Sequence, residues 1–157
     1  MMLREAKTGD LDVVAGFLSA MIQEMASYGG HSVAEGQHAS AWCHNHVVSR
    51  LSDPDCVLLL AESEELPATA LGFVEASITE PHPVFQAKRV LHIHSLYVDL
   101  AHRRSGLGRR LLEAALQWGK GRDCVDAQLN SLAGNPARRL YESLGFNVFE
   151  LELRRRL

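Results

Sequence analysis

The sequence has 157 residues, of which 46% are apolar and 22% are charged, and its formal net charge is −3 at pH 7. This length predicts a single globular domain, residues 1–157, that is large enough to bury a core. The slightly acidic balance argues against a nucleic-acid-binding protein, which usually shows a basic excess. No apolar run approaches the length of a membrane span or of the apolar part of a signal peptide, so we expect no membrane association.

Hydrophobic patterning predicts one strand and two helices at the start of the chain. A short strand is expected over residues 2–6. Apolar residues at three- and four-residue spacing then predict a helix from Leu11 to Met25, which ends at Gly29-Gly30. A second, less regular helix is expected over residues 33–51, before the turn residues at 52–55 break it.

The rest of the chain predicts strands that precede and alternate with helices. Strands at 56–61 and 70–78 flank a polar turn and are expected to form an antiparallel hairpin. The later elements are expected as a strand at 90–98, a helix at 106–119, a strand at 125–129, a helix at 136–144 and one or two strands within 146–153. This order indicates one mixed, mostly antiparallel sheet flanked by helices, an α/β or α+β fold.

The widely spaced cysteines are odd in number and form no Cys-x-x-Cys pair: Cys43, Cys56 and Cys124. This pattern argues against a disulfide framework and against a cysteine zinc site, so we expect a reduced, cytoplasmic protein. Histidines 44, 46, 92 and 94 could supply metal ligands, but no His-Glu-x-x-His signature accompanies them. We therefore expect no metal.

The most informative motif, Arg103-Arg104-Ser105-Gly106-Leu107-Gly108, joins the strand at 90–98 to the next helix. Its glycines permit a sharp bend and let ligand oxygens approach the backbone N–H groups. The first N–H groups of the helix have no intrahelical partner and lie at the positive end of the helix dipole. Together with the basic side chains, this order predicts a phosphate-binding site.

A second motif lies further along the chain, Asn135-Pro136-Ala137-Arg138-Arg139-Leu140-Tyr141-Glu142-Ser143-Leu144-Gly145-Phe146. Together, the two motifs resemble the GNAT superfamily of N-acetyltransferases, whose core carries R/Q-x-x-G-x-G/A and then N…A-x-x-L-Y-E-x-L-G-F. The resemblance is strongest over residues 90–149. It implies that the cosubstrate is acetyl-CoA and that an amine attacks its acetyl group directly in a ternary complex.

The resemblance also implies where acetyl-CoA binds. The pyrophosphate is expected on the backbone of residues 104–109, and the pantetheine arm is expected to pair with the strand at 90–98 like an added strand. Such pairing requires this strand to diverge from the strand at 125–129. The implied cofactor-binding residues are Leu96, Tyr97, Val98, Arg103, Arg104, Ser105, Gly106, Leu107, Gly108, Arg109, Asn135 and Tyr141.

The chemical roles follow from the same resemblance. Tyr141 matches a tyrosine near the cofactor sulfur, where a phenol with an ordinary pKa near ~10 can protonate the leaving thiolate. A backbone N–H near Leu96 is the expected oxyanion donor. His94 stands where many members carry a glutamate base, and a neutral imidazole can take the proton of the amine. His92, Glu75 and a chain of waters are the alternatives for the base.

Three positions depart from the family pattern. Arg104 stands where glycine is common, and Leu100 stands where proline often precedes the turn. Asn135 comes one residue later than the family asparagine, and Gly134 holds the usual position. Because Asn135 followed by Pro136 is also a good helix N-cap, capping is the alternative to a cofactor contact.

The acceptor is left open by the sequence, and a small-molecule amine and a peptide amine both fit the resemblance. Carboxylates in the expected acceptor region, among them Glu24, Glu35 and Glu80, could bind a cationic amine. Family members often form dimers, and a homodimer is compatible with this chain. The alternative function is a non-catalytic acyl-CoA-binding module that keeps the fold without the chemistry.

Overall fold

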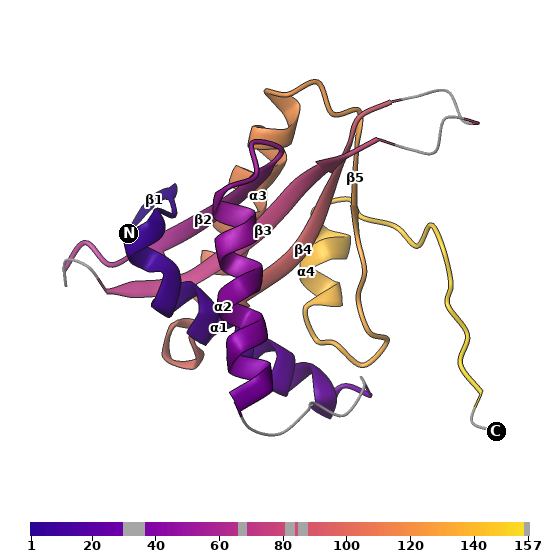
Figure 1. The fold of residues 1–157 in the computed structure, drawn as a ribbon. Coiled ribbons are helices and arrows are strands. Elements are labelled where there is room, and N and C mark those ends of the chain that lie inside the picture. The colour runs from indigo at the N-terminus through magenta and orange to yellow at the C-terminus, as the bar shows by residue number, and fades with distance from the viewer. Residues whose placement is uncertain (30–36, 66–68, 81–83, 85–87, 156–157) are drawn as a thin grey trace.

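The computed structural model describes residues 1–29, 37–65, 69–80, 84 and 88–155. One five-stranded sheet crosses this part of the chain in the order β1-β2-β3-β4-β5 (Figure 1). The strands are β1 (Met2–Glu5), β2 (Cys56–Glu62), β3 (Ala70–Thr79), β4 (Val90–Val98) and β5 (Asp126–Leu129). The first four pair antiparallel to their neighbours, and β5 pairs parallel to β4. The predicted fold class is therefore confirmed.

Helices cover both faces of the sheet (Figure 1). The α-helices are α1 (Leu11–Ser27), α2 (Gln37–Leu51), α3 (Leu107–Lys120) and α4 (Arg138–Ser143), and short 3-10 helices span Thr8–Asp10 and Leu100–His102. The start expected for α2, at 33–36, lies outside the described residues. Alternate residues of β2 and β3 point to opposite faces because side chains alternate along a strand, and two apolar clusters result. One cluster packs under α1 and α2, and the other packs under α3.

A bulge interrupts the pairing of β3 with β4. Glu75 lies opposite Ser95, but the next residue, Ala76, lies opposite Ile93. His94 is therefore the extra residue of β4, and the strand is not regular at this point. Because of this bulge, the regular alternation of side chains along a strand changes at His94.

The parallel pairing of β4 with β5 is short. It runs from Val90 opposite Asp126 to Ile93 opposite Leu129. β4 continues to Val98, so residues 94–98 have β3 on one side and no described strand on the other. The divergence of these two strands that the sequence analysis required is present.

The end of α4 follows its sequence closely. Gly145 adopts φ +87°, its N–H donates to Glu142 O, and the N–H of Phe146 donates to Tyr141 O. This pair of bonds forms a Schellman motif, which satisfies carbonyl groups at the helix end. Gly145 therefore terminates this helix, which was expected over 136–144 and is observed over Arg138–Ser143.

The strands predicted within 146–153 are absent. Residues 146–155 form no helix or strand and run away from the sheet after Gly145 (Figure 1, yellow). The side chains of Val148, Phe149, Leu151 and Leu153 are exposed. An alternating apolar pattern specifies a strand only where a neighbouring strand can accept its backbone hydrogen bonds, and no described strand lies beside this segment.

Candidate functional site

The turn before α3 has the conformation that its sequence predicts. Gly106 adopts φ +82°, and Arg104 adopts the same left-handed region at φ +64°, which is uncommon for a residue with a Cβ. The first α-helical bond of α3 runs from the N–H of Arg110 to Gly106 O. The N–H groups of Leu107, Gly108 and Arg109 therefore lack partners within the helix and are available to an anion.

Three elements meet at Gly108. A Cβ at this position would lie 3.4 Å from Leu140 Cδ2 of α4 and 3.7 Å from Val98 Cγ2 at the end of β4. The start of α3, the end of β4 and α4 therefore border one point. This point adjoins the stretch of β4 that has no partner strand on the side of β5, so the anion site and the open strand edge are continuous.

The side chains of residues 96–98, along the open edge of β4, pack into the hydrophobic core. Leu96 and Val98 pack against the cluster under α3, and Tyr97 is buried in the cluster under α1 and α2. Only their backbone groups face the gap that β5 leaves. An extended ligand with amide groups could pair there as a short extra strand.

The other implied phosphate contacts carry side chains that already have partners. Arg103 donates to Glu24 and to Val98 O. Arg109 Nη2 donates to Ser143 Oγ at 2.7 Å, and Ser105 Oγ donates to His102 O at 2.6 Å. The backbone of this turn is thus more available for a phosphate group than these side chains are.

Tyr141 lies on α4 next to Leu140, at the same junction. Its ring packs edge-to-face on Phe146, with 6.2 Å between ring centroids, and against the cluster under α3. Burial raises the pKa of Tyr141 above its ordinary value of 10.0, so the phenol carries its proton at neutral pH. Its hydroxyl makes no hydrogen bond to a described residue, which leaves it available as a donor.

The N-cap of α4 is Ala137, not Asn135, and no described side chain caps this helix. Asn135 instead closes the turn just before the helix. Its Oδ1 accepts the N–H of Ala137 at 2.9 Å, and its carbonyl accepts the N–H of Arg138 at 3.2 Å. Helix α4 begins at Arg138, two residues later than the start at residue 136 that the sequence predicts. The side-chain oxygen is thus engaged locally, and a cofactor contact of Asn135 stays a prediction.

His94 and His92 lie together on the side of α2. Their ring centroids are 4.6 Å apart, and His94 Nε2 lies 2.6 Å from Ser77 Oγ. Desolvation by the surrounding groups lowers the pKa of His94 to about 4, although the nearby Glu75 carboxylate opposes this change. Partial burial also lowers the pKa of His92. His94 is exposed, so solvent offsets some of the effect, but its imidazole is neutral at pH 7 in either case.

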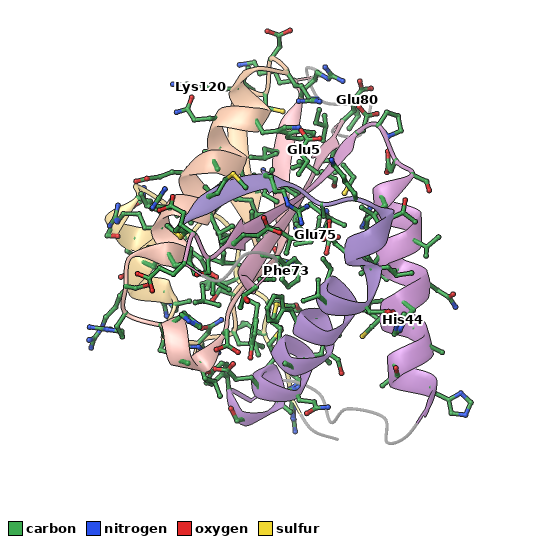
Figure 2. The ribbon with its side chains drawn as sticks, turned by 90° about the vertical axis from the view of Figure 1, so that its left-hand side faces the viewer. Glu5, His44, Phe73, Glu75, Glu80 and Lys120 are labelled. Atoms are coloured by element: carbon green, nitrogen blue, oxygen red, sulfur yellow. The ribbon has the colours of Figure 1, made fainter. Side chains whose placement is uncertain are left out.

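Glu75 has a different environment, because its side chain is only 1% exposed. Its carboxylate accepts from Arg50 Nε at 2.9 Å, from His46 Nε2 at 2.9 Å and from Ser95 Oγ at 3.0 Å. Figure 2 shows Glu75 and Phe73 on the face of the sheet that is directed toward α1 and α2. The buried charge is thus paired and hydrogen-bonded, as burial requires.

Four partners in this region were not predicted from the sequence: Glu24 as a partner of Arg103, and Arg50, Ser77 and Ser95 around the bulge. The available signal was a run of polar residues, Glu75, Ser77 and Ser95, at alternate positions of otherwise apolar strands. Such residues indicate buried hydrogen bonds, because an unpaired buried polar group is costly. Their partners on α2 could not be read from the spacing.

Of the carboxylates that could bind a cationic acceptor, some are paired with arginines and others lie outside the described residues. Glu24 pairs with Arg103, and Glu62 pairs with Arg4. Glu35 and most of the loop after β3 lie outside the described residues. In the part of the chain that the structure describes, no three His, Cys, Asp or Glu side chains are arranged to hold a metal ion, and no helix has the length and apolarity to cross a membrane.

Comparison with known proteins gives one family match and individual relatives. Residues 15–146 match the model of the Acetyltransferase (GNAT) family. The uncharacterized N-acetyltransferase YhfO of Bacillus subtilis is 29% identical over 151 residues, which are 93% of this chain and 89% of that protein. The aminoglycoside N(6′)-acetyltransferase type 1 of Klebsiella aerogenes is 32% identical over 92 residues, 56% of this chain and 59% of the relative.

The fold is also found among solved structures. A predicted acetyltransferase with acetyl-CoA from Clostridium acetobutylicum superposes with a TM-score of 0.75 at 16% identity, covering 98% of this chain and 95% of that one. At this identity the likeness concerns the fold alone.

Proposed function

This chain belongs to the acetyltransferase (GNAT) family, and we propose that it transfers the acetyl group of acetyl-CoA to a primary amine of a small molecule or peptide. The observation that carries the proposal is the open edge of β4, which leads directly into a helix start with unpartnered N–H groups. The first feature suits the amide-containing pantetheine arm and the second suits the pyrophosphate. Acetyl-CoA carries both groups, in this order.

The proposed reaction is direct attack in a ternary complex. The amine nitrogen forms a bond to the thioester carbonyl carbon, and the tetrahedral oxyanion accepts a hydrogen bond from a backbone N–H of β4 near Leu96. The C–S bond then breaks, and the sulfur leaves as a thiolate. Tyr141, a protonated phenol on α4, donates its proton or a hydrogen bond to that sulfur.

His94 remains the proposed base for the amine proton. It is the exposed member of the three candidate side chains, whereas Glu75 is buried and held by Arg50 and His46. If Nε2–H donates to Ser77 Oγ, the ring is oriented and its Nδ1 can take the proton. Because its pKa is low, His94 is a weak base, but its imidazole is unprotonated at neutral pH and can accept the proton. A chain of waters is the alternative base. Glu75 then holds α2 against the bulge that carries His94.

The acceptor proposed is a small amine. The aminoglycoside acetyltransferase among the relatives acts on a small-molecule class, as its name states, but it matches little more than half of this chain. Two described carboxylates that could bind a cationic acceptor, Glu24 and Glu75, are paired with arginines. A singly charged amine therefore fits the described region better than a polycation does.

The experiment is an acetyl-transfer assay beside a binding assay. Thiol release from acetyl-CoA is followed across a panel of small amines, aminoglycosides and peptides, and CoA binding is measured by calorimetry. Amine-dependent thiol release would support the enzyme. CoA binding without turnover on any amine would instead favour the non-catalytic acyl-CoA-binding module, and failure to bind CoA would refute both.

A further inference from the structure

An ion pair joins the last turn of α1 to the turn proposed for the pyrophosphate. Arg103 Nη1 donates to Glu24 Oε1 at 2.7 Å, and Nη2 donates to Glu24 Oε2 at 2.6 Å. The two residues are 79 positions apart in the sequence. This two-point geometry fixes the plane of the guanidinium as well as its position.

The same guanidinium also holds the end of β4. Its Nε donates to Val98 O at 3.0 Å, and it lies 5.4 Å from the centroid of the Tyr97 ring. Tyr97 in turn packs against Phe17 of α1, with 5.5 Å between ring centroids. One side chain therefore connects α1, the end of the open strand edge and the turn.

The local electrostatics favour this arrangement. The side chains of Arg103 and Glu24 are 33% and 26% exposed, so solvent screens the pair only in part. The Arg103 guanidinium lowers the pKa of the Glu24 carboxyl, and Glu24 raises the pKa of Arg103. The hydroxyl of Tyr28 donates to the same carboxylate, which also raises the pKa of Tyr28. Glu24 is thus fully ionised at neutral pH.

The position of Arg103 bears directly on the anion site. Arg104 follows it in the left-handed conformation, and Gly106 adopts this conformation two residues later. Because the backbone of such a turn is strained at a residue with a Cβ, it needs support from neighbouring contacts. The contacts of Arg103 with Glu24 and Val98 supply that support from outside the turn.

We propose that Glu24 is a positioning residue for the cofactor: it acts through Arg103 to fix the backbone that binds the pyrophosphate. This inference rests on the proposed function. It means that α1, which packs on the face of the sheet opposite α3, sets the affinity for acetyl-CoA. The competing idea is that Arg103 leaves Glu24 and binds the phosphate itself, and it predicts the opposite result, since loss of Glu24 would then release Arg103.

The test is calorimetric CoA binding to the wild type, Glu24→Gln and the control Glu62→Gln. The control, Glu62→Gln, removes the charge of another partly buried carboxylate. Glu62 pairs with Arg4 where β1 and β2 form the edge of the sheet. We expect Glu24→Gln to weaken CoA binding about tenfold, the usual scale for one lost charge-assisted interaction, while Glu62→Gln binds as the wild type.

A second readout needs no ligand. Amide hydrogen exchange of residues 103–108 should become faster in Glu24→Gln than in the wild type, and it should not change in Glu62→Gln. If Glu24→Gln proved too unstable, Tyr28→Phe would remove only the phenol's hydrogen bond to Glu24, and a smaller loss of affinity is expected.

The outcomes separate the two proposals. Wild-type affinity or tighter binding in a folded Glu24→Gln protein, or unchanged exchange in its turn, would overturn the positioning role and leave the acetyltransferase proposal standing. A wild-type protein that does not bind CoA would refute the proposed function and this inference with it.

Discussion

Replacement of Gly108 tests the proposed cofactor position most directly. An alanine Cβ there would lie at ordinary contact distances, 3.4 Å from Leu140 Cδ2 and 3.7 Å from Val98 Cγ2, so the protein itself can accommodate it. The helix also gains from the change, by up to about 1 kcal/mol for glycine to alanine. The methyl group, however, occupies the point where the open edge of β4 meets the anion site.

We therefore expect Gly108→Ala to weaken CoA binding by about 1 kcal/mol without loss of stability, and Gly108→Val by about 1–3 kcal/mol. Each 1.4 kcal/mol is about a tenfold change in Kd. Calorimetric titration with CoA measures the affinity, and thermal unfolding measures the stability. The matched control is Gly121→Ala at the other end of α3, where a Cβ would meet nothing closer than 3.6 Å. Wild-type CoA affinity in a folded Gly108→Val protein would refute the proposed position.

Other changes test the remaining features. Tyr141→Phe should lower kcat by about 10²–10⁴-fold, the usual worth of general-acid assistance, with CoA affinity nearly intact; an unchanged kcat would reduce Tyr141 to packing. For His94, the lowered pKa means that the folded protein resists its protonation, whereas the unfolded chain binds the proton below its ordinary pKa of 6.5. His94 should therefore contribute to loss of stability as the pH falls from 6.5 toward 4, and urea unfolding at pH 7 and pH 5 should show a smaller difference in His94→Gln than in the wild type. Arg104→Gly should stabilise the protein by up to about 1 kcal/mol in urea unfolding, because relief of the left-handed strain outweighs the greater freedom of glycine in the unfolded chain; a destabilised variant would show that the Arg104 side chain has a structural role.

The elements with strong local signals were predicted well. The helix after the glycine turn was expected over 106–119 and is observed over Leu107–Lys120, because its apolar periodicity and its glycine ends act locally. The C-terminal strands were predicted from an equally clear alternation and are absent. Helix signals are satisfied within the segment, whereas a strand depends on a partner edge elsewhere in the fold.

The candidate site also combines features that the local sequence predicts with features that depend on distant residues. The backbone turn and its place before α3 followed from Gly106 and Gly108. The bulge at His94 did not, since it depends on the register between β3 and β4. The pairs Glu24–Arg103 and Glu75–His46 join residues 79 and 29 positions apart, and such pairing has no local signature. Sequence could thus indicate candidate groups for the proposed chemistry, but not which groups hold them in place.

The short contact between β4 and β5 has a consequence for the lifetime of the protein. β5 is held by four residue pairs, α4 has no fully buried residue, and an exposed apolar segment follows it. Such a weakly packed unit opens more often than the rest of the sheet, and proteases cleave chains in their open form. A pantetheine arm bound in the gap, as proposed above, would bind only the closed form and so suppress opening. The cellular supply of acetyl-CoA would then govern how quickly the protein is degraded as well as how fast it works.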